Sequence, residues 1–212
     1  MTRAPSADGA LVTVQNLGGN KLDLYARRTV EHSCEIREDT TVCDTTTEIA
    51  NRTPRGLTRF QYQYRPYGLF KNYVEIYIPE AARLDGVTAG GRAVRFSNLA
   101  EDGYRAIGAY LKIQRGQEGS MRVSYTLPAG ERGYTLSVLP QPLARDARVA
   151  VNLVAPAGWS LSGPESSRVT DGVLRFGGTL RGPLEFEAGP DARTGLAKLW
   201  SGFSRFLREP LF

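Results

Sequence analysis

Short runs of alternating apolar and polar residues, most of them ending at Gly or Pro, recur along most of the chain. In the clearest run, residues 73–79, Val74, Ile76 and Ile78 fall on one face and alternate with tyrosines and a glutamate. This period-two pattern is typical of a half-buried β-strand. More than ten such strands, separated by turn residues, predict an all-β fold: an immunoglobulin-like antiparallel sandwich.

A Pro- and Gly-containing stretch at residues 128–133 divides this pattern into two packed β units. We expect a flexible N-terminal segment at residues 1–10, a larger β-sandwich unit at residues 11–130 and a smaller β unit at residues 131–190. Because about 60 residues are marginal for an independent core, we expect the smaller unit to pack on the larger one.

Helical periodicity replaces the alternation in residues 191–212, where one wide apolar stripe repeats every three to four positions. The residues of this stripe are Leu196, Leu199, Trp200, Phe203, Phe206 and Leu207. The pattern predicts one amphipathic C-terminal helix. Its apolar stripe could pack on the sandwich, on a partner protein or on a membrane surface, and all three alternatives stay open.

Two cysteines lie in a Thr- and Val-rich run that is typical of a β-hairpin turning at Glu38-Asp39. With this turn, the two residue numbers in each cross-strand pair add up to 77, and Cys34 and Cys43 form such a pair. Directly opposed side chains are close enough for a disulfide. The alternative is two separate buried thiols. A disulfide would indicate an oxidising, extracytoplasmic compartment.

The composition excludes most familiar catalytic chemistry. The 212 residues contain a single histidine, His32, so a metal site built from several His ligands is excluded, and no metal or cofactor is expected. Paired carboxylates are the remaining route to catalysis. Glu75 with Glu101 or Asp102 would serve a glycan-active enzyme, which we keep as the alternative to a non-catalytic module.

Charge is concentrated in two neighbouring segments: residues 31–48 carry six acids and one base, and residues 49–74 carry five bases and no acid. The basic segment also carries aromatic side chains, which stack on sugar rings, while its cationic groups bind acidic groups. The candidate binding residues are Arg55, Arg59, Tyr62, Tyr64, Arg65, Tyr67 and Lys71. The alternatives are that one face of this segment belongs to the core and that the acidic segment neutralises its bases.

The motif Gly19-Asn20-Lys21-Leu22-Asp23, followed at residues 68–79 by a Lys-Asn-Tyr-Val segment and an apolar strand, resembles a known family. This family is the actinobacterial cell-envelope domain of unknown function numbered four thousand and twelve, and the resemblance is to its C-terminal part. Leu24 stands where that family has Tyr, and Lys71 where it has Arg. The resemblance implies a membrane anchor and an upstream domain outside this sequence, together with an association with envelope glycopolymers. It offers no catalytic residues.

These observations together predict a non-catalytic extracytoplasmic β module of a cell-envelope protein, anchored through a segment outside this sequence. Such a module would bind or position an envelope glycopolymer or a partner protein. Its expected partners are an anionic envelope glycopolymer or another envelope protein, the upstream domain of the same polypeptide, and a membrane surface reached through the C-terminal helix. Nucleic acid is not expected, because the disulfide register and the resemblance both indicate a location outside the cytosol.

Overall fold

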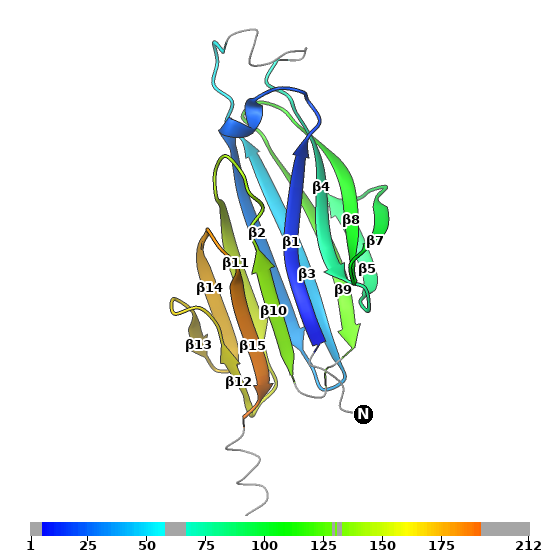
Figure 1. Cartoon of the computed structure of the whole chain (residues 1–212), viewed down its shortest axis with the longest axis vertical. Helices are drawn as coiled ribbons and strands as arrows, with labels where there is room; N and C mark the ends of the chain where they lie inside the picture. Colours follow the sequence, from blue (N-terminus) through cyan, green and yellow to red (C-terminus); the bar gives the residue numbers. More distant parts are fainter. Residues whose placement is uncertain (1–5, 58–66, 129, 131–132, 192–212) are drawn as a thin grey trace, which may run out of the picture.

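The computed structural model describes residues 6–57, 67–128, 130 and 133–191, which form two β-sheets packed face to face (Figure 1). Within these residues, one sheet has seven strands in the order β12 (Trp159–Ser162), β15 (Leu184–Pro190), β10 (Tyr134–Leu139), β1 (Ser6–Asn16), β4 (Phe70–Pro79), β8 (Tyr104–Ile113) and β7 (Ser97–Glu101). The other has eight in the order β13 (Arg168–Thr170), β14 (Val173–Leu180), β11 (Ala147–Val154), β2 (Ala26–Ile36), β3 (Thr40–Asn51), β9 (Glu118–Pro128), β5 (Arg83–Ala89) and β6 (Arg92–Ala93). A short 3-10 helix, η1 (Leu22–Tyr25), precedes β2. The prediction of an all-β sandwich is confirmed.

The sheets are mixed, so the prediction of a purely antiparallel sandwich is wrong. β1 pairs in parallel with β10, and β2 pairs in parallel with β11. Alternation within a strand records which face is buried, but it carries no information about the direction of the neighbouring strand. Through these two pairs, strands from residues 131–190 extend both of the sheets that residues 11–130 begin.

The first strand begins earlier than the sequence pattern predicts. β1 starts at Ser6, so residues 6–10 form strand where we expected a flexible segment. Asp8 is 2% exposed and Ala10 is 1% exposed, because their side chains lie between the sheets. This burial holds the first residues of β1 in the sandwich.

The predicted C-terminal helix lies outside the described residues, which end at Asp191. Its six apolar residues are therefore not placed by the structure. In the part of the chain that the structure does describe, no helix has the length and apolar character needed to span a membrane.

β2 and β3 form the predicted hairpin. The backbone N–H of Arg37 donates to the carbonyl oxygen of Thr40 at 2.8 Å across the Glu38-Asp39 turn. The register pairs Cys34 with Cys43, their Cα atoms lie 4.2 Å apart, and the two sulfurs are bonded. The disulfide prediction is confirmed, and the buried bond indicates an oxidising, extracytoplasmic compartment.

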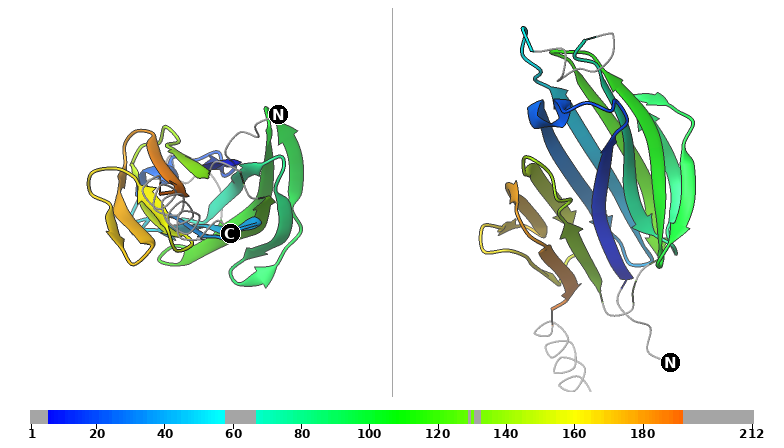
Figure 2. Two further views of the ribbon diagram at one scale, coloured as in Figure 1. Left: turned by 90° about the horizontal axis from the view of Figure 1, so that it is seen from below. Right: turned by 45° about the horizontal axis from the view of Figure 1, so that its top comes forward.

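The core lies between the two sheets, which wrap around a common interior in Figure 2. On β4 the predicted inward face is correct, since Val74, Ile76 and Ile78 are all completely buried. The tyrosines that alternate with them lie on the outer face of the seven-stranded sheet and are only partly buried. The sandwich thus presents a polar and aromatic outer surface over an apolar interior.

Candidate functional site

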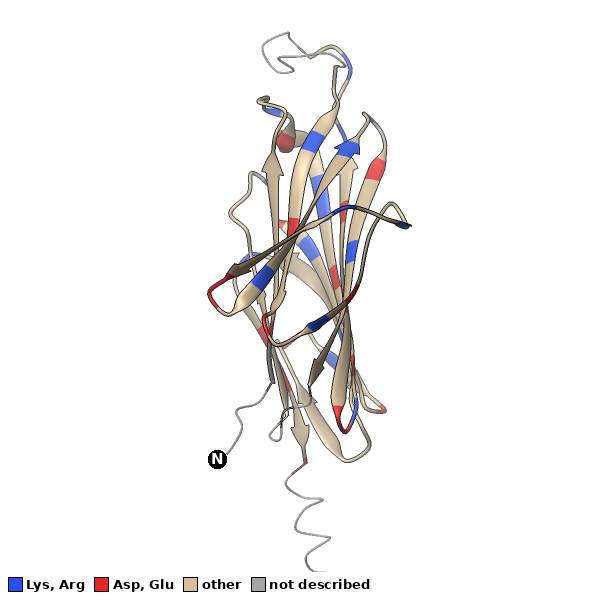
Figure 3. Cartoon of the chain, turned by 90° about the vertical axis from the view of Figure 1, so that its right-hand side faces the viewer, with Lys and Arg blue, Asp and Glu red and all other residues tan. Residues whose placement is uncertain are grey.

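Basic side chains gather at one end of the sandwich. This is the end at which β1, β3 and β8 finish and β2, β4 and β9 begin (Figure 1). The described bases at this end are Lys21, Arg27, Arg28, Arg52, Arg55, Lys71, Lys112 and Arg115. We call this set the basic end. In Figure 3 the blue positions accumulate toward the same end of the molecule. Segments that are far apart in the sequence therefore bring basic residues to the same end of the sandwich, on the outer faces of both sheets.

The structure places part of the predicted binding segment at the basic end. Arg55 and Lys71 are exposed there, and Tyr67 is 49% exposed. The other predicted residues, Arg59, Tyr62, Tyr64 and Arg65, lie outside the described residues. Sequence reasoning missed the bases contributed by β2 and by the β8–β9 turn, because only strand pairing brings them beside this segment.

A buried asparagine, Asn51 at the end of β3, fixes the geometry of the basic end. Its Nδ2 donates to the carbonyl oxygens of Gly68 (2.7 Å) and Ile113 (2.9 Å). Its Oδ1 accepts from the backbone N–H and the hydroxyl of Thr53, at 3.1 and 2.6 Å. The Asn51 backbone also bonds to the turn at residues 116–117. One side chain thus joins the loops that carry the bases of both sheets.

The Gly-Asn-Lys-Leu-Asp motif forms the corner between β1 and β2 at this end. Gly19 adopts a positive φ of 56°, a conformation that glycine reaches without steric cost. The side-chain amide of Asn16 donates to the Asn20 backbone carbonyl at 2.9 Å and also to the carboxylate of Asp23. Leu22 is 1% exposed and anchors the corner in the core. The motif therefore has a structural role in this fold.

A groove of about 460 Å³ lies on the outer face of the eight-stranded sheet at the basic end. Arg27, Arg52 and Arg148 line it together with Glu48 and Glu118. Arg52 forms an ion pair with Glu118 at 2.5 Å, and a hydrogen bond with Glu118 raises the pKa of Glu48. The groove therefore carries mixed charge, which makes it a weaker candidate for an anionic ligand than the seven-stranded sheet.

The outer face of β4 and β8 carries two lysines side by side. Lys71 lies directly opposite Lys112 in the antiparallel register, and both are exposed. Within the described residues neither lysine forms an ion pair, whereas the acidic segment forms its ion pairs with Arg37 and Arg122. These lysines are thus available to an external anion.

Two of the carboxylates considered for catalysis, Glu75 and Glu101, lie on the outer face of the same sheet, and the third, Asp102, lies in the exposed turn that follows β7. Glu75 is 8% exposed and accepts hydrogen bonds from Thr13 (2.9 Å) and Gln15 (3.3 Å). Glu101 accepts from the hydroxyl of Tyr77 at 3.0 Å. Burial, this hydrogen bond and the nearby negative charges raise the pKa of Tyr77 to about 12. The two acids connect β1, β4 and β7, which is a structural role.

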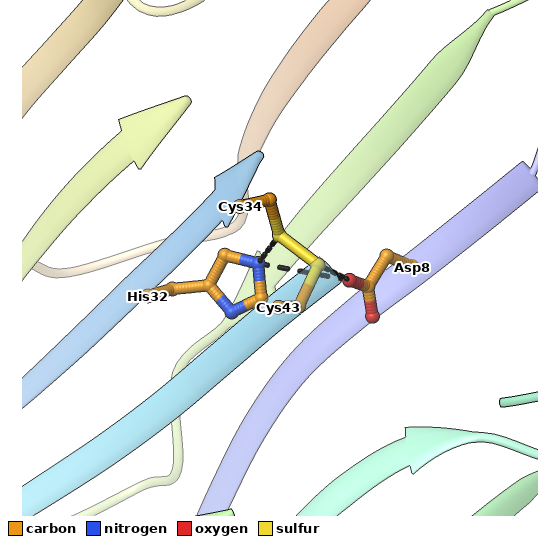
Figure 4. A group of neighbouring side chains, drawn as sticks. All are labelled: Asp8, His32, Cys34 and Cys43. Atoms are coloured by element: carbon orange, nitrogen blue, oxygen red, sulfur yellow. Dashed lines mark hydrogen bonds and ion pairs between the residues drawn. A yellow bond between two sulfur atoms is a disulfide. The ribbon is translucent and has the colours of Figure 1, made fainter. Parts of the chain in front are cut away.

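A separate polar cluster is buried between the sheets, on the strands rather than in the loops (Figure 4). Its potential metal ligands are Asp8, His32, Cys34 and Cys43, whose ligand atoms all lie within 4.8 Å of one another. Cysteine binds zinc as a thiolate. The sulfurs of Cys34 and Cys43 are bonded to each other, so neither is a thiolate. The hydroxyl of Tyr134 also lies among these groups, 2.8 Å from Asp8 Oδ2 and 3.2 Å from His32 Nε2. With the disulfide closed, the cluster is structural.

The Asp8 carboxylate is well supplied with donors despite its burial. The hydroxyl of Tyr125 donates to it at 2.8 Å, that of Tyr134 at 2.8 Å and the Gly9 backbone N–H at 2.8 Å. On the other side of the cluster, His32 Nδ1 lies 2.9 Å from the Thr45 hydroxyl. Hydrogen bonding of this kind offsets the free-energy cost of burying a charge.

The buried cluster predicts a pH window for stability. Burial lowers the pKa of His32 below 6.5, with the nearby Asp8 opposing the shift, and burial raises the pKa values of Tyr125 and Tyr134 well above 10.0. Below about pH 6.5 the unfolded chain binds a proton that folded His32 does not, so stability falls by up to ~1.4 kcal/mol per pH unit. Above about pH 10 the unfolded tyrosines lose protons that the folded ones keep, so stability falls again.

Urea unfolding between pH 8 and pH 5 measures the acidic limb of this window. His32→Gln, which keeps a polar side chain but does not titrate, is expected to flatten the slope below about pH 6.5. An unchanged slope in this variant would contradict the assignment to His32.

Comparison with known proteins gives fold similarity only. No family model matches the chain, and no curated protein matches it. Among solved structures, a protein from Legionella pneumophila described as nutrient-binding is 7% identical, with a TM-score of 0.48 over 89% of this chain and 71% of that one. The M1 zinc metallopeptidase of Deinococcus radiodurans is 16% identical, with a TM-score of 0.40 over 77% of this chain. Leukotriene A4 hydrolase of Saccharomyces cerevisiae is 7% identical, with a TM-score of 0.42 over 77% of this chain.

The chain spans only 41% of the length of the Deinococcus enzyme and 28% of the yeast enzyme. Similarity at this level assigns neither an activity nor a substrate to this protein.

Proposed function

We propose that this chain is a non-catalytic, extracytoplasmic β module of a cell-envelope protein and that its basic end binds an anionic envelope glycopolymer. The observation that carries the proposal is the pair Lys71 and Lys112, which are exposed, directly opposed and without an ion pair in the described part of the chain. The buried disulfide supports a location outside the cytosol. The resemblance carried by residues 19–23 supports the cell envelope.

The opposed lysines favour an acidic ligand on energetic grounds. Like charges directly opposite each other in an antiparallel pair are destabilising, and an anion between them relieves this repulsion. Arg55 and Arg115 add positive charge at the same end of the sandwich, because the buried Asn51 bonds to Thr53 and to the turn at residues 116–117 beside them. Such a surface attracts a polyanion over about 8–10 Å in physiological salt.

The test compares two pairs of basic residues. The double variant Lys71→Gln/Lys112→Gln is expected to bind polygalacturonate about tenfold more weakly than the wild type at low salt, which corresponds to ~1.4 kcal/mol. The matched control is Arg168→Gln/Arg175→Gln, which removes another exposed, directly opposed basic pair from β13 and β14. Biolayer interferometry with the immobilised glycan measures both affinities.

The control variant is expected to bind within about twofold of the wild type, and wild-type binding should weaken as salt is raised. Equal losses in the two double variants would show that only net charge matters and would contradict a site at the basic end. Absence of binding to any anionic glycan at low salt would contradict the proposed function and favour a partner protein.

A further inference from the structure

We propose that the outer face of β4 and β8 holds an acidic-sugar site, in which Tyr73 and Tyr110 stack on a sugar ring while Lys71 and Lys112 bind the anionic group that the ring carries. This inference rests on the proposed function and names the ligand class of the same surface: a polysaccharide whose sugar units bear acidic substituents.

The aromatic part of this site is exposed. Tyr110 is 71% exposed, the largest exposed fraction among the large apolar side chains in the described ranges. Its ring lies beside that of Tyr73, with centroids 5.0 Å apart and planes tilted by 53°. Aromatic rings present a large apolar face with a polar rim, which suits the mixed C–H and hydroxyl surface of a sugar. An aromatic pair in which one ring is this exposed and the other is partly buried is a feature of interaction surfaces.

A glycine holds the Tyr73 ring in place. A Cβ at Gly108 would lie 2.6 Å from the Tyr73 ring carbon Cζ, so only glycine leaves room for the ring to cross β8. The Tyr73 hydroxyl then reaches the hydroxyl of Ser97 on β7 and forms a hydrogen bond with it. The ring is therefore fixed before any ligand arrives, which lowers the entropic cost of binding.

The cationic part lies next to the aromatic part by strand register. Lys71 opposes Lys112 and Tyr73 opposes Tyr110, so each lysine is two residues from a tyrosine on the same face. This spacing is about 7 Å along the strand. One sugar unit can therefore contact a ring with its face and a lysine with its acidic substituent.

A carboxylate on the opposite side orients the ligand. Glu75 is two residues from Tyr73 in the other direction, and it is held by Thr13 and Gln15 from β1. An acidic substituent on this side would meet a like charge, whereas on the other side it meets two lysines. The site thus rejects one orientation of an acidic sugar and favours the other.

Binding of the full chain to two polyanions tests this inference. The probes are polygalacturonate, which has acidic sugar rings, and polyphosphate, which has none. Tyr110→Ala is expected to bind polygalacturonate about tenfold more weakly and polyphosphate within about twofold of the wild type. Leu99→Ala is the matched control, because Leu99 is a 58% exposed apolar residue on the neighbouring strand β7 and should not affect either affinity.

Two further variants separate stacking from loss of folding. Tyr110→Phe keeps the ring and is expected to bind polygalacturonate like the wild type, so a loss equal to that of Tyr110→Ala would overturn stacking. Gly108→Ser displaces the Tyr73 ring and is expected to lower polygalacturonate affinity without lowering polyphosphate affinity. Circular dichroism of each variant reports its folded fraction.

The outcomes distinguish this site from the proposed function. One outcome is that Lys71→Gln/Lys112→Gln lowers the affinity for polygalacturonate while Tyr110→Ala and Gly108→Ser leave it unchanged. In that case the proposed function stands, and the stacking of a sugar ring on Tyr73 and Tyr110 is overturned. If polygalacturonate is not bound and a single-stranded oligonucleotide is bound with the same dependence on Tyr110, the acidic-sugar assignment is overturned, because bases also stack on aromatic rings.

Discussion

Replacing Asp8 with Ala is expected to lower the free energy of unfolding by about 3–5 kcal/mol, a large part of the stability of a domain of this size. The substitution removes the shared acceptor of the hydroxyl groups of Tyr125 and Tyr134 and of the Gly9 backbone N–H. Both tyrosines are at most 1% exposed, so their hydroxyl groups do not face bulk water when this acceptor is removed. Each unpaired buried donor costs about 1–3 kcal/mol. Urea unfolding at neutral pH measures the change.

A second substitution separates lost hydrogen bonds from general damage to the core. In the Asp8→Ala background, Tyr125→Phe removes one of the unpaired hydroxyls and is expected to cost less than it does in the wild type. If the two substitutions simply add, Asp8 and Tyr125 are not coupled, and the stabilising role assigned to this cluster is wrong.

Asn51→Leu is expected to lower the free energy of unfolding by about 2–4 kcal/mol. Leucine is similar in size to asparagine, but its side chain forms no hydrogen bonds and so cannot join the loops at the basic end. The carbonyl oxygens of Gly68 and Ile113 and the N–H of Thr53 would lose their buried partners. Thermal and urea unfolding measure the loss of stability. Hydrogen exchange should also accelerate in the turn at residues 116–117, which the Asn51 backbone contacts.

Asn98→Leu is the control for this substitution, since Asn98 is an exposed asparagine on β7. It is expected to leave the free energy of unfolding within about 0.5 kcal/mol of the wild type. If Asn51→Leu unfolds like this control, the geometry of the basic end depends on other contacts.

Local patterns in the sequence predicted local features of the fold. The inward face of β4 follows from the period of two along a strand, and the Cys34–Cys43 register follows from the position of the Glu38-Asp39 turn, so a few consecutive residues suffice to derive each of them. The parallel pairing of β1 with β10 depends on two strands whose own patterns do not record which strand lies beside them. This information is distributed over the whole chain, and reading one segment at a time misses it.

The candidate site also contains residues that a local sequence pattern predicts and residues that only strand pairing brings to it. Arg55 and Lys71 were found because they belong to one basic segment, whereas Lys112 and Tyr110 join them only through the pairing of β4 with β8. Asp8 could have been found from the sequence. Counting back by twos from the buried Val12 and Ala10 places it on the inward face, where an acid requires partners.

The two parallel ladders also bear on how the chain folds. They join Ser6 to Tyr134 and Thr29 to Arg148. Neither sheet is therefore complete until β10 and β11, which come more than 100 residues later in the chain, have paired with β1 and β2. Closing loops of this length precedes any gain from the contacts, which places the domain among slow folders, on the scale of milliseconds to seconds. Until β10 and β11 arrive, β1 and β2 each leave one row of backbone N–H and C=O groups unpaired, and such edges promote intermolecular strand pairing. During synthesis, the Cys34–Cys43 hairpin can form before either ladder closes, because its two strands are adjacent in the chain.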